Sequence, residues 1–194
     1  MRNRRLILDS ALEEFSRDGY GGATLDAIAR GAGLSKPNLL YYFDGKTEIY
    51  VTLLSQLVET WLDPLIELDP DGDPVEELLG YVRRKLEMSR DMPAESKLFA
   101  GEILQGAPRI GDHLRNELKP LFEKKCAAIQ GWIDDGRLAP VDPAHLLFTI
   151  WSTTQHYADF EAQISVLLGG DAPHARATAH LDQMFRQLLT PANN

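Results

Sequence analysis

The stretch TLDAIARGAGLSKPNLLYYF, Thr24 to Phe43, decides the fold of the first part of the chain. Thr24 and Ser35 are residue types that cap helix starts, because their hydroxyl oxygens accept hydrogen bonds from free backbone N–H groups. Gly33 supplies a turn that needs positive φ, and Ala29 leaves room where two helices cross. The spacing therefore predicts a helix-turn-helix, which reads DNA; the alternative is an ordinary helix pair that contacts no DNA.

Apolar residues on either side of this stretch extend the prediction. Those before it recur at helical spacing and end at Gly19: Ile7, Leu8, Ala11, Leu12 and Phe15. They predict a third helix that lies across the other two. Residues 44–62 predict a long connecting helix that Asp63-Pro64 breaks or restarts, since proline disrupts a helix interior.

The remaining sequence is also punctuated as helices. Asp73-Pro74 and Asp142-Pro143 each place a capping residue before a proline suited to the first helical turn. Other boundaries fall at Met92-Pro93, at residues 106–108 and at Asp135-Gly136, and Pro120 predicts a kink in a helix over residues 109–134. The sequence therefore predicts an all-α fold of about nine helices. Residues 1–46 would form a helix-turn-helix DNA-binding domain, and residues 47–194 an effector-binding and dimerisation domain.

The charge is unevenly distributed. The chain has 194 residues and a formal net charge of -9, although DNA-binding proteins are usually basic. Residues 1–50 carry seven basic and seven acidic side chains, which leaves 13 basic and 22 acidic ones in residues 51–194. DNA would therefore repel the second part more than the first, which orients the molecule. We expect weak non-specific DNA binding that falls steeply with salt.

The sequence also favours a soluble, cytoplasmic protein. Cys126 is the only cysteine, so no disulfide can form within the chain and a reducing compartment is the natural one. The first nine residues hold too few apolar side chains for a signal-peptide core. The apolar run from Leu146 to Trp151 is too short to span a bilayer.

The pattern of residues 1–50 resembles the TetR family of bacterial transcriptional regulators. The resemblance rests on the amino-terminal helix, the Thr24 to Phe43 stretch and Lys46, with Pro37 where the family usually has glycine. The segments KLEMSRDMPAESKLFAGEILQGAP (85–108) and GWIDDGRLAPVDPAHLLFTIWSTTQHYADF (131–160) resemble a pyrimidine-sensing branch of that family. This resemblance implies a homodimeric repressor whose affinity for an operator changes when uracil or thymine binds.

Several exposed side chains of the second motif helix are expected to contact DNA. Asn38 can pair with adenine, Lys36 can reach guanine, and Leu40 can contact a thymine methyl. By resemblance, Thr24, Tyr42 and Lys46 hold phosphates; otherwise Lys46 is a solvated charge at a helix start. Arg2, Arg4 and Arg5 would add a short basic arm. The predicted DNA-binding residues are Thr24, Ser35, Lys36, Pro37, Asn38, Leu40, Tyr41, Tyr42 and Lys46.

Two helices in the second part are expected to form the dimer. The helix from Pro143 to about Gln163 is apolar on several sides, which suits a helix that faces both the core and a partner. The last helix, which carries Leu181, Phe185 and Leu188, is its natural companion. By resemblance, the two pair with their copies in a four-helix bundle.

A small-molecule pocket is predicted around Trp151 and Gln155, which lie one helical turn apart on the same face. An indole can stack on a nucleobase while a glutamine amide pairs with its edge. Trp61, Phe99 and Glu102 are further candidates for the pocket wall. The alternatives are a hydrogen-bonded core glutamine beside a packed tryptophan, and a DNA-binding module that no small molecule controls.

An enzymatic interpretation would start from His156 and Asp159, which share a helix face. No nucleophile motif accompanies them, and the sequence has no metal-spaced Cys/His cluster and no phosphate-binding glycine loop. We therefore expect no catalytic residue, no cofactor and no metal site.

Overall fold

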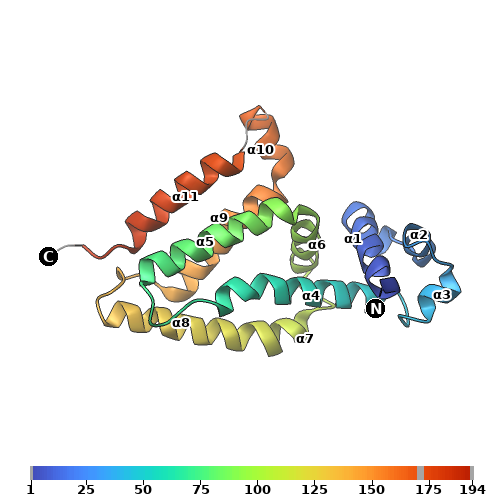
Figure 1. The fold of residues 1–194 in the computed structure, drawn as a ribbon, viewed down its shortest axis with the longest axis horizontal. Helices are drawn as coiled ribbons and strands as arrows, with labels where there is room; N and C mark the ends of the chain where they lie inside the picture. The colour runs from blue at the N-terminus through green and yellow to red at the C-terminus, as the bar shows by residue number, and fades with distance from the viewer. Residues whose placement is uncertain (1, 170–172, 193–194) are drawn as a thin grey trace. The chain divides into compact units, whose positions relative to one another are not determined.

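The structure is a computed structural model that describes residues 2–169 and 173–192, and those ranges contain helices and no strands (Figure 1). The all-α prediction is confirmed. The chain divides into two compact units, Met1–Thr60 with Ala94–Leu114, and Trp61–Pro93 with Arg115–Asn194. This division differs from the predicted functional boundary between residues 46 and 47, which stays a prediction because compactness does not report which part binds DNA.

The first unit contains the predicted helix-turn-helix. Its elements are α1 (Arg2–Gly22), α2 (Leu25–Gly31), α3 (Lys36–Leu40), the first part of α4 (Lys46–Ile66), α6 (Pro93–Leu104) and α7 (Gly111–His113). In α1 the backbone leaves the helical conformation at Gly19 (φ 67°, ψ 175°), where the sequence predicts the end of the first helix.

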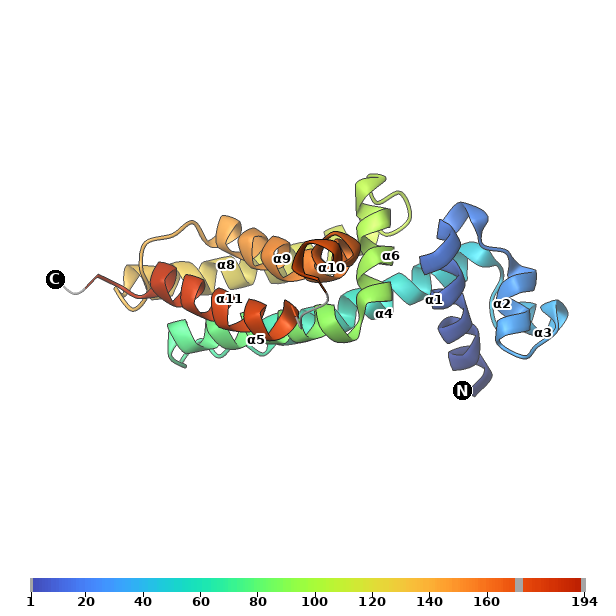
Figure 2. The ribbon, with the colours of Figure 1, turned by 90° about the horizontal axis from the view of Figure 1, so that it is seen from above.

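A small apolar core lies beneath α1, α2 and α3, which are grouped together in Figure 2. Helix α1 contributes Phe15, α2 contributes Ile28 and α3 contributes Leu39, and none of these side chains is more than 1% exposed. The edge of the Tyr50 ring, from α4, packs on Phe15 with the ring centroids 4.9 Å apart. These buried side chains fix the orientation of α3 relative to α1 and α2.

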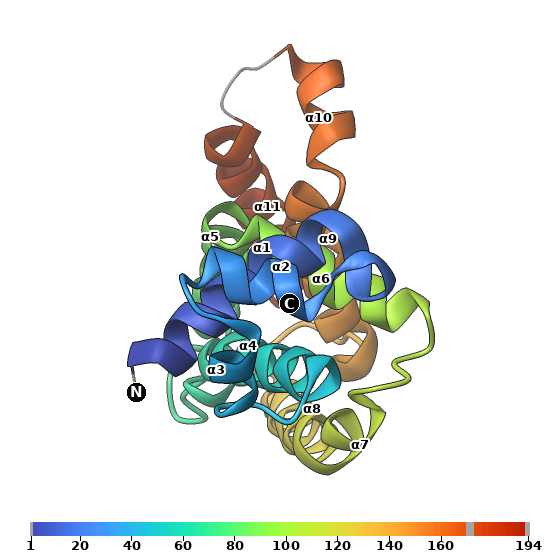
Figure 3. The same ribbon diagram turned by 90° about the vertical axis from the view of Figure 1, so that its right-hand side faces the viewer.

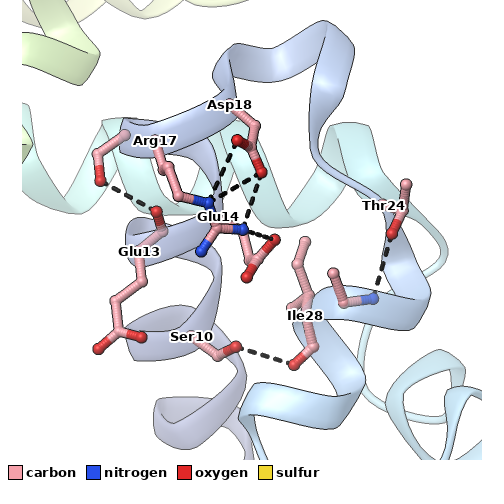
Figure 4. A network of polar contacts seen from close by, with 9 residues as sticks. Ser10, Glu13, Glu14, Arg17, Asp18, Thr24 and Ile28 are labelled. Carbon is pink, nitrogen blue, oxygen red and sulfur yellow. Dashed lines mark hydrogen bonds and ion pairs between the residues drawn. The ribbon is translucent and has the colours of Figure 1, made fainter.

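The crossing of α1 and α2 depends on one hydrogen bond and one glycine. The buried Ser10 hydroxyl donates to the Ile28 carbonyl oxygen over 2.9 Å (Figure 4). A Cβ added to Gly31 would lie 2.2 Å from Ser10 Oγ and 3.2 Å from Ser10 Cβ. The sequence predicts Ala29 as the small residue at this crossing; Ala29 is buried, but the contact that excludes a larger side chain involves Gly31.

The second unit packs α5 (Pro74–Asp91) against both α9 (Pro143–Asp159) and α11 (Pro173–Leu189), and α8 (Lys119–Asp134) against α9 (Figure 2). Helix α10 (Glu161–Leu168) lies beside α11 (Figure 3). The predicted caps are confirmed, because Asp73 accepts from the Glu76 N–H and Asp142 from the His145 N–H. The core is built mainly from leucines, isoleucines and aromatic residues of these helices, among them Leu79, Trp132, Leu147, Ile150 and Phe185.

Three predicted helix boundaries are wrong. Helix α4 continues through Pro64 to Ile66, because proline removes one N–H while the buried Leu65 side chain holds the last turn in the core. The stretch up to Phe43 predicts that the second motif helix packs through Leu39, Tyr42 and Phe43, but α3 stops at Leu40, and the Tyr42 N–H donates to the Leu39 carbonyl in a tighter turn. The helix that begins at Pro143 ends at Asp159 instead of continuing to about Gln163.

The predicted helix over residues 109–134 is divided. It comprises α7, a π-helical turn, η1 (Leu114–Leu118), and α8, with Pro120 in the first turn of α8. Pro120 therefore does not kink a helix interior. It lies in the first turn of α8, where a backbone N–H has no partner within the helix and its absence costs nothing. The irregular backbone lies directly before it.

We expect Gly31→Ala to lower the free energy of unfolding by about 1 to 3 kcal/mol, the usual cost of overpacking. The added methyl must displace the Ser10 hydroxyl from the Ile28 carbonyl. Urea unfolding of Gly31→Ala, Ser10→Ala and the double variant measures the coupling between the two positions. The double variant should lose less free energy of unfolding than the two single variants lose together. Gly80→Ala is the matched control, because a Cβ there meets no atom within 4 Å. Equal stability of Gly31→Ala and the unaltered protein would contradict this account of the crossing.

Candidate DNA interface and effector residues

The turn between α2 and α3 is built by two caps and a glycine. The Thr24 hydroxyl oxygen accepts from the Ala27 N–H at 3.2 Å (Figure 4), and that of Ser35 accepts from the Asn38 N–H at 3.4 Å. Gly33 has φ 68°, a conformation that L residues with a side chain rarely adopt. The predicted local structure of the helix-turn-helix is therefore confirmed.

One side of α3 is buried and the other is open. Leu39 is fully buried, whereas Leu40 is 42% and Tyr41 84% exposed. Lys36, Pro37 and Asn38 are also exposed. Side chains that read base edges must be accessible, so the exposed face of α3 is suited to this role, although the base contacts themselves stay predictions.

Lys36 already has a partner within the first unit. Its ammonium lies 2.9 Å from the Asp26 carboxylate of α2, and both side chains are substantially exposed. Exposed ion pairs of this kind contribute about 0 to 1 kcal/mol, so DNA can compete for Lys36 at little cost. Asp26 therefore holds the lysine in the free protein, and a contact of Lys36 with guanine stays a prediction.

Lys46 joins α1 to α4. Its ammonium donates to the carbonyl oxygens of Tyr20 at 2.7 Å and Ala23 at 2.9 Å, and it lies 4.6 Å from the Tyr20 ring centroid. The alternative of a solvated charge at a helix start is wrong. A phosphate contact stays a prediction, and it would be made by an ammonium that the backbone already orients.

The three arginines of the predicted basic arm belong to α1, which begins at Arg2, and the first turn of that helix contacts the segment that follows α3. Their contact with DNA stays a prediction. Arg4 donates to the Tyr42 carbonyl at 2.9 Å and its guanidinium lies 4.1 Å from the Phe43 ring centroid. The Asn3 amide donates to the Tyr42 hydroxyl oxygen at 2.9 Å. This leaves the Tyr42 O–H proton available for a phosphate, consistent with its predicted role.

Glu102 is fully buried in the first unit, where Arg109 neutralises it. The Arg109 backbone N–H donates to Oε1 at 2.7 Å and its guanidinium to Oε2 at 3.0 Å. The guanidinium also lies 3.7 Å from the Tyr20 ring centroid. Burial, followed by the negative charge of Glu102, raises the pKa of Tyr50 to about 12. Intramolecular partners thus account for the buried carboxylate without a ligand.

The five predicted pocket residues divide between the units. Phe99 and Glu102 belong to the first unit, whereas Trp61, Trp151 and Gln155 belong to the second. The Trp151 indole N–H donates to the Tyr81 hydroxyl oxygen at 2.6 Å. Gln155 is partly buried one turn later on α9. A single pocket that contains all five residues stays a prediction.

Lys85 is a functional candidate that the sequence interpretation missed. It lies on α5 in the second unit, is 5% exposed, and places its ammonium 4.8 Å from the Trp61 ring centroid. Burial lowers the pKa of Lys85 to about 8, although the negative charge of Asp159 acts in the opposite direction. A sequence signal was present, because Lys85 falls on the apolar stripe of α5 that contains Leu78 and Val82.

Comparison with known proteins identifies the family. The family model described as "Bacterial regulatory proteins, tetR family" matches residues 7–53, and "YcdC-like protein, C-terminal region" matches residues 54–192. The HTH-type transcriptional regulator RutR of Escherichia coli K12 is 47% identical over 166 residues, which cover 86% of this chain and 78% of RutR. The chain belongs to the TetR family. It is accordingly a helix-turn-helix transcriptional regulator, and regulators of this family bind DNA operators.

The chain is also similar to a second regulator and to solved structures. The HTH-type transcriptional repressor SCO4008 of Streptomyces coelicolor is 27% identical over 168 residues, covering 86% of this chain and 84% of the repressor. Among solved structures, the transcriptional regulator SCO4942 of Streptomyces coelicolor matches with a TM-score of 0.79 at 24% identity, covering 96% of this chain and 98% of that one. The fatty acid degradation regulator FadR of Bacillus halodurans matches with a TM-score of 0.66 at 18% identity, covering 95% and 93%. These two structures support the fold alone.

His156, from which an enzymatic interpretation would start, packs against an aromatic ring. The exposed His156 ring stacks on Phe160, with the ring centroids 4.7 Å apart. Within residues 2–169 and 173–192, no group of three or more His, Cys, Asp or Glu side chains could hold a metal ion. The relatives above are transcriptional regulators.

In the same described part of the chain, residues 2–169 and 173–192, no helix is long and apolar enough to cross a membrane.

Stability should rise with pH between about 8 and 10.5 because of Lys85. Its pKa is about 8 in the folded protein against an ordinary value of 10.5, so in this window the unfolded chain binds more protons. The lysine therefore destabilises the fold at neutral pH, and that cost is relieved as pH rises, by at most about 1.4 kcal/mol per pH unit. Urea unfolding of the unaltered protein and Lys85→Met at pH 7.5, 8.5 and 9.5 measures it. As pH rises, the free energy of unfolding of the unaltered protein should increase relative to that of Lys85→Met. A difference that stays constant over this pH range would contradict the burial of Lys85.

Proposed function

We propose that this TetR-family protein is a homodimeric repressor that inserts α3 of each protomer into the major groove of a palindromic operator, and that a pyrimidine, uracil or thymine, changes its affinity for that operator. The observation that carries the DNA-binding part is the open face of α3. It presents Lys36, Asn38, Leu40 and Tyr41 to solvent while Leu39 anchors the helix.

The chemistry of this face supports specific contacts. Asn38 offers a donor and an acceptor that match adenine, Lys36 offers donors for guanine, and Leu40 an apolar surface for a thymine methyl. Thr24, Tyr42 and Lys46 lie at the helix junctions and would hold phosphates. Because one five-residue helix can contact only a few base pairs, useful specificity needs two copies of the motif.

Exposed apolar side chains in the second unit support a dimer. Phe148 and Phe160, at α9, are 49% and 53% exposed, and Leu188 on α11 is 44% exposed. Large apolar side chains grouped on two neighbouring helices are typical of an interaction surface. We propose that α9 and α11 pair with their copies as a four-helix bundle. We also propose that the protein acts in the cytoplasm and performs no catalysis.

The pyrimidine effector is proposed from the chemistry of Trp151 and Gln155 and from the 47% identity to RutR. Aromatic side chains supply flat surfaces for a nucleobase, and an amide can pair with the donor and acceptor on its edge. The second candidate is a repressor with an unrelated effector or none. The Trp151–Tyr81 hydrogen bond favours this candidate, because it already satisfies the indole N–H.

We expect Asn38→Ala to weaken operator binding by about 1 to 3 kcal/mol and to relax specificity at one base pair per half-site. Selection from randomised duplexes would give the operator, and fluorescence anisotropy of the selected duplex and its single-base variants would give the affinities. Asn116→Ala, an exposed asparagine in η1, is the matched control and should bind like the unaltered protein. The α3 contact would be refuted if Asn38→Ala kept both the affinity and the base preference.

A further inference from the structure

Lys85 lies between two hydrogen bonds that join α5 to α9. Tyr81, Lys85 and Ser89 are one helical turn apart on α5 and therefore share a face. On one side of Lys85, the Tyr81 hydroxyl accepts from the Trp151 indole. On the other side, the Ser89 hydroxyl donates to the Thr154 carbonyl over 2.9 Å. Lys85 is thus held opposite the α9 segment that runs from Trp151 to Gln155.

The ammonium of Lys85 lacks the hydrogen bonds that a buried charge needs. Within residues 2–169 and 173–192 its close contact is the Trp61 ring, and the negative charge of Asp159 does not outweigh its burial. Lys125 in the same unit shows the usual solution. It is 7% exposed, and its ammonium donates to the carbonyl oxygens of Ile66 at 2.9 Å and Leu68 at 3.1 Å. Because burying a charge without hydrogen bonds is costly, the different surroundings of Lys85 call for an explanation.

We propose that Lys85 binds the effector, and that its ammonium donates a hydrogen bond to an oxo oxygen on the ring of a dioxopyrimidine. This inference rests on the pyrimidine effector of the proposed function. An oxo oxygen is the acceptor that the lysine lacks, and the Trp61 and Trp151 rings supply flat surfaces for a planar base. The lysine thus contributes to binding at a cost to the stability of the empty protein.

The same arrangement accounts for both oxo oxygens of a dioxopyrimidine. Uracil and thymine carry two oxo oxygens on either side of a ring N–H. The Gln155 amide can pair with that N–H and one oxygen, which leaves the second oxygen for Lys85. Cytosine has one oxo oxygen, which Lys85 can also reach, and a Gln155 amide turned by about 180° can pair with its ring nitrogen and exocyclic amine. Lys85 therefore recognises an oxo oxygen of the ring, and cytosine offers one as uracil does.

Calorimetric titration of uracil and cytosine into the full-length protein, Lys85→Met and Lys125→Met tests the inference. A charge-assisted hydrogen bond contributes enough that Lys85→Met should bind uracil roughly 10- to 100-fold more weakly. Any binding of cytosine should weaken by a similar factor, because cytosine also offers an oxo oxygen to the ammonium. At pH 7, Lys85→Met should melt at or above the Tm of the unaltered protein, because an unpaired buried charge is removed. Lys125→Met should melt lower and keep its uracil affinity.

The outcomes separate this inference from the proposed function. If the unaltered protein binds uracil and Lys85→Met binds it equally well, the role of Lys85 is overturned and the pyrimidine effector stands. If the unaltered, folded protein gives no heat with uracil, thymine or cytosine, both are overturned. Should Lys85→Met fail to fold by circular dichroism, Lys85→Gln replaces it, and undiminished uracil affinity in that variant overturns the inference.

Discussion

Helix α2 has seven residues and α3 has five, and helices this short are not stable by themselves in water. The surface that would read DNA therefore exists only because other parts of the first unit hold it. Phe15 of α1 and Tyr50 of α4 close the core from one side, and Lys46 ties the end of α1 to the start of α4. Any change that loosens this core must also loosen α3, so a loss of stability in this unit should also weaken DNA recognition.

The sequence predicts well those features that depend on a residue and its immediate neighbours. The Thr24 and Ser35 caps, the positive φ of Gly33 and the capped prolines after Asp73 and Asp142 follow from local backbone chemistry, and the structure has all of them. Helix ends that depend on distant packing were predicted less well. Pro64 does not end α4, because buried side chains outweigh the loss of one backbone hydrogen bond.

Contacts between residues far apart in the sequence explain most of what the interpretation missed. Nothing near Arg4 indicates that it packs on Phe43, and nothing near Gly31 indicates that Ser10 of another helix occupies the space above it. Glu102 is one of the residues predicted for the pocket wall. Its partner is Arg109, seven residues later in the chain, instead of a ligand.

The buried charges of this protein meet the cost of desolvation in different ways. Glu102 has a guanidinium and a backbone N–H, and Lys125 has two carbonyl oxygens at the end of α4, so both are satisfied within the fold. Lys85 has an aromatic ring, which attracts a cation but accepts no strong hydrogen bond, and the negative charge of Asp159, which does not outweigh its burial. A methionine of similar length would fill the same space without that cost, so stability alone does not explain a lysine here. A hydrogen-bond acceptor supplied by a ligand does explain it. The ammonium then forms, in the complex, the hydrogen bond that it lacks in the protein without ligand, and that bond contributes to the binding free energy.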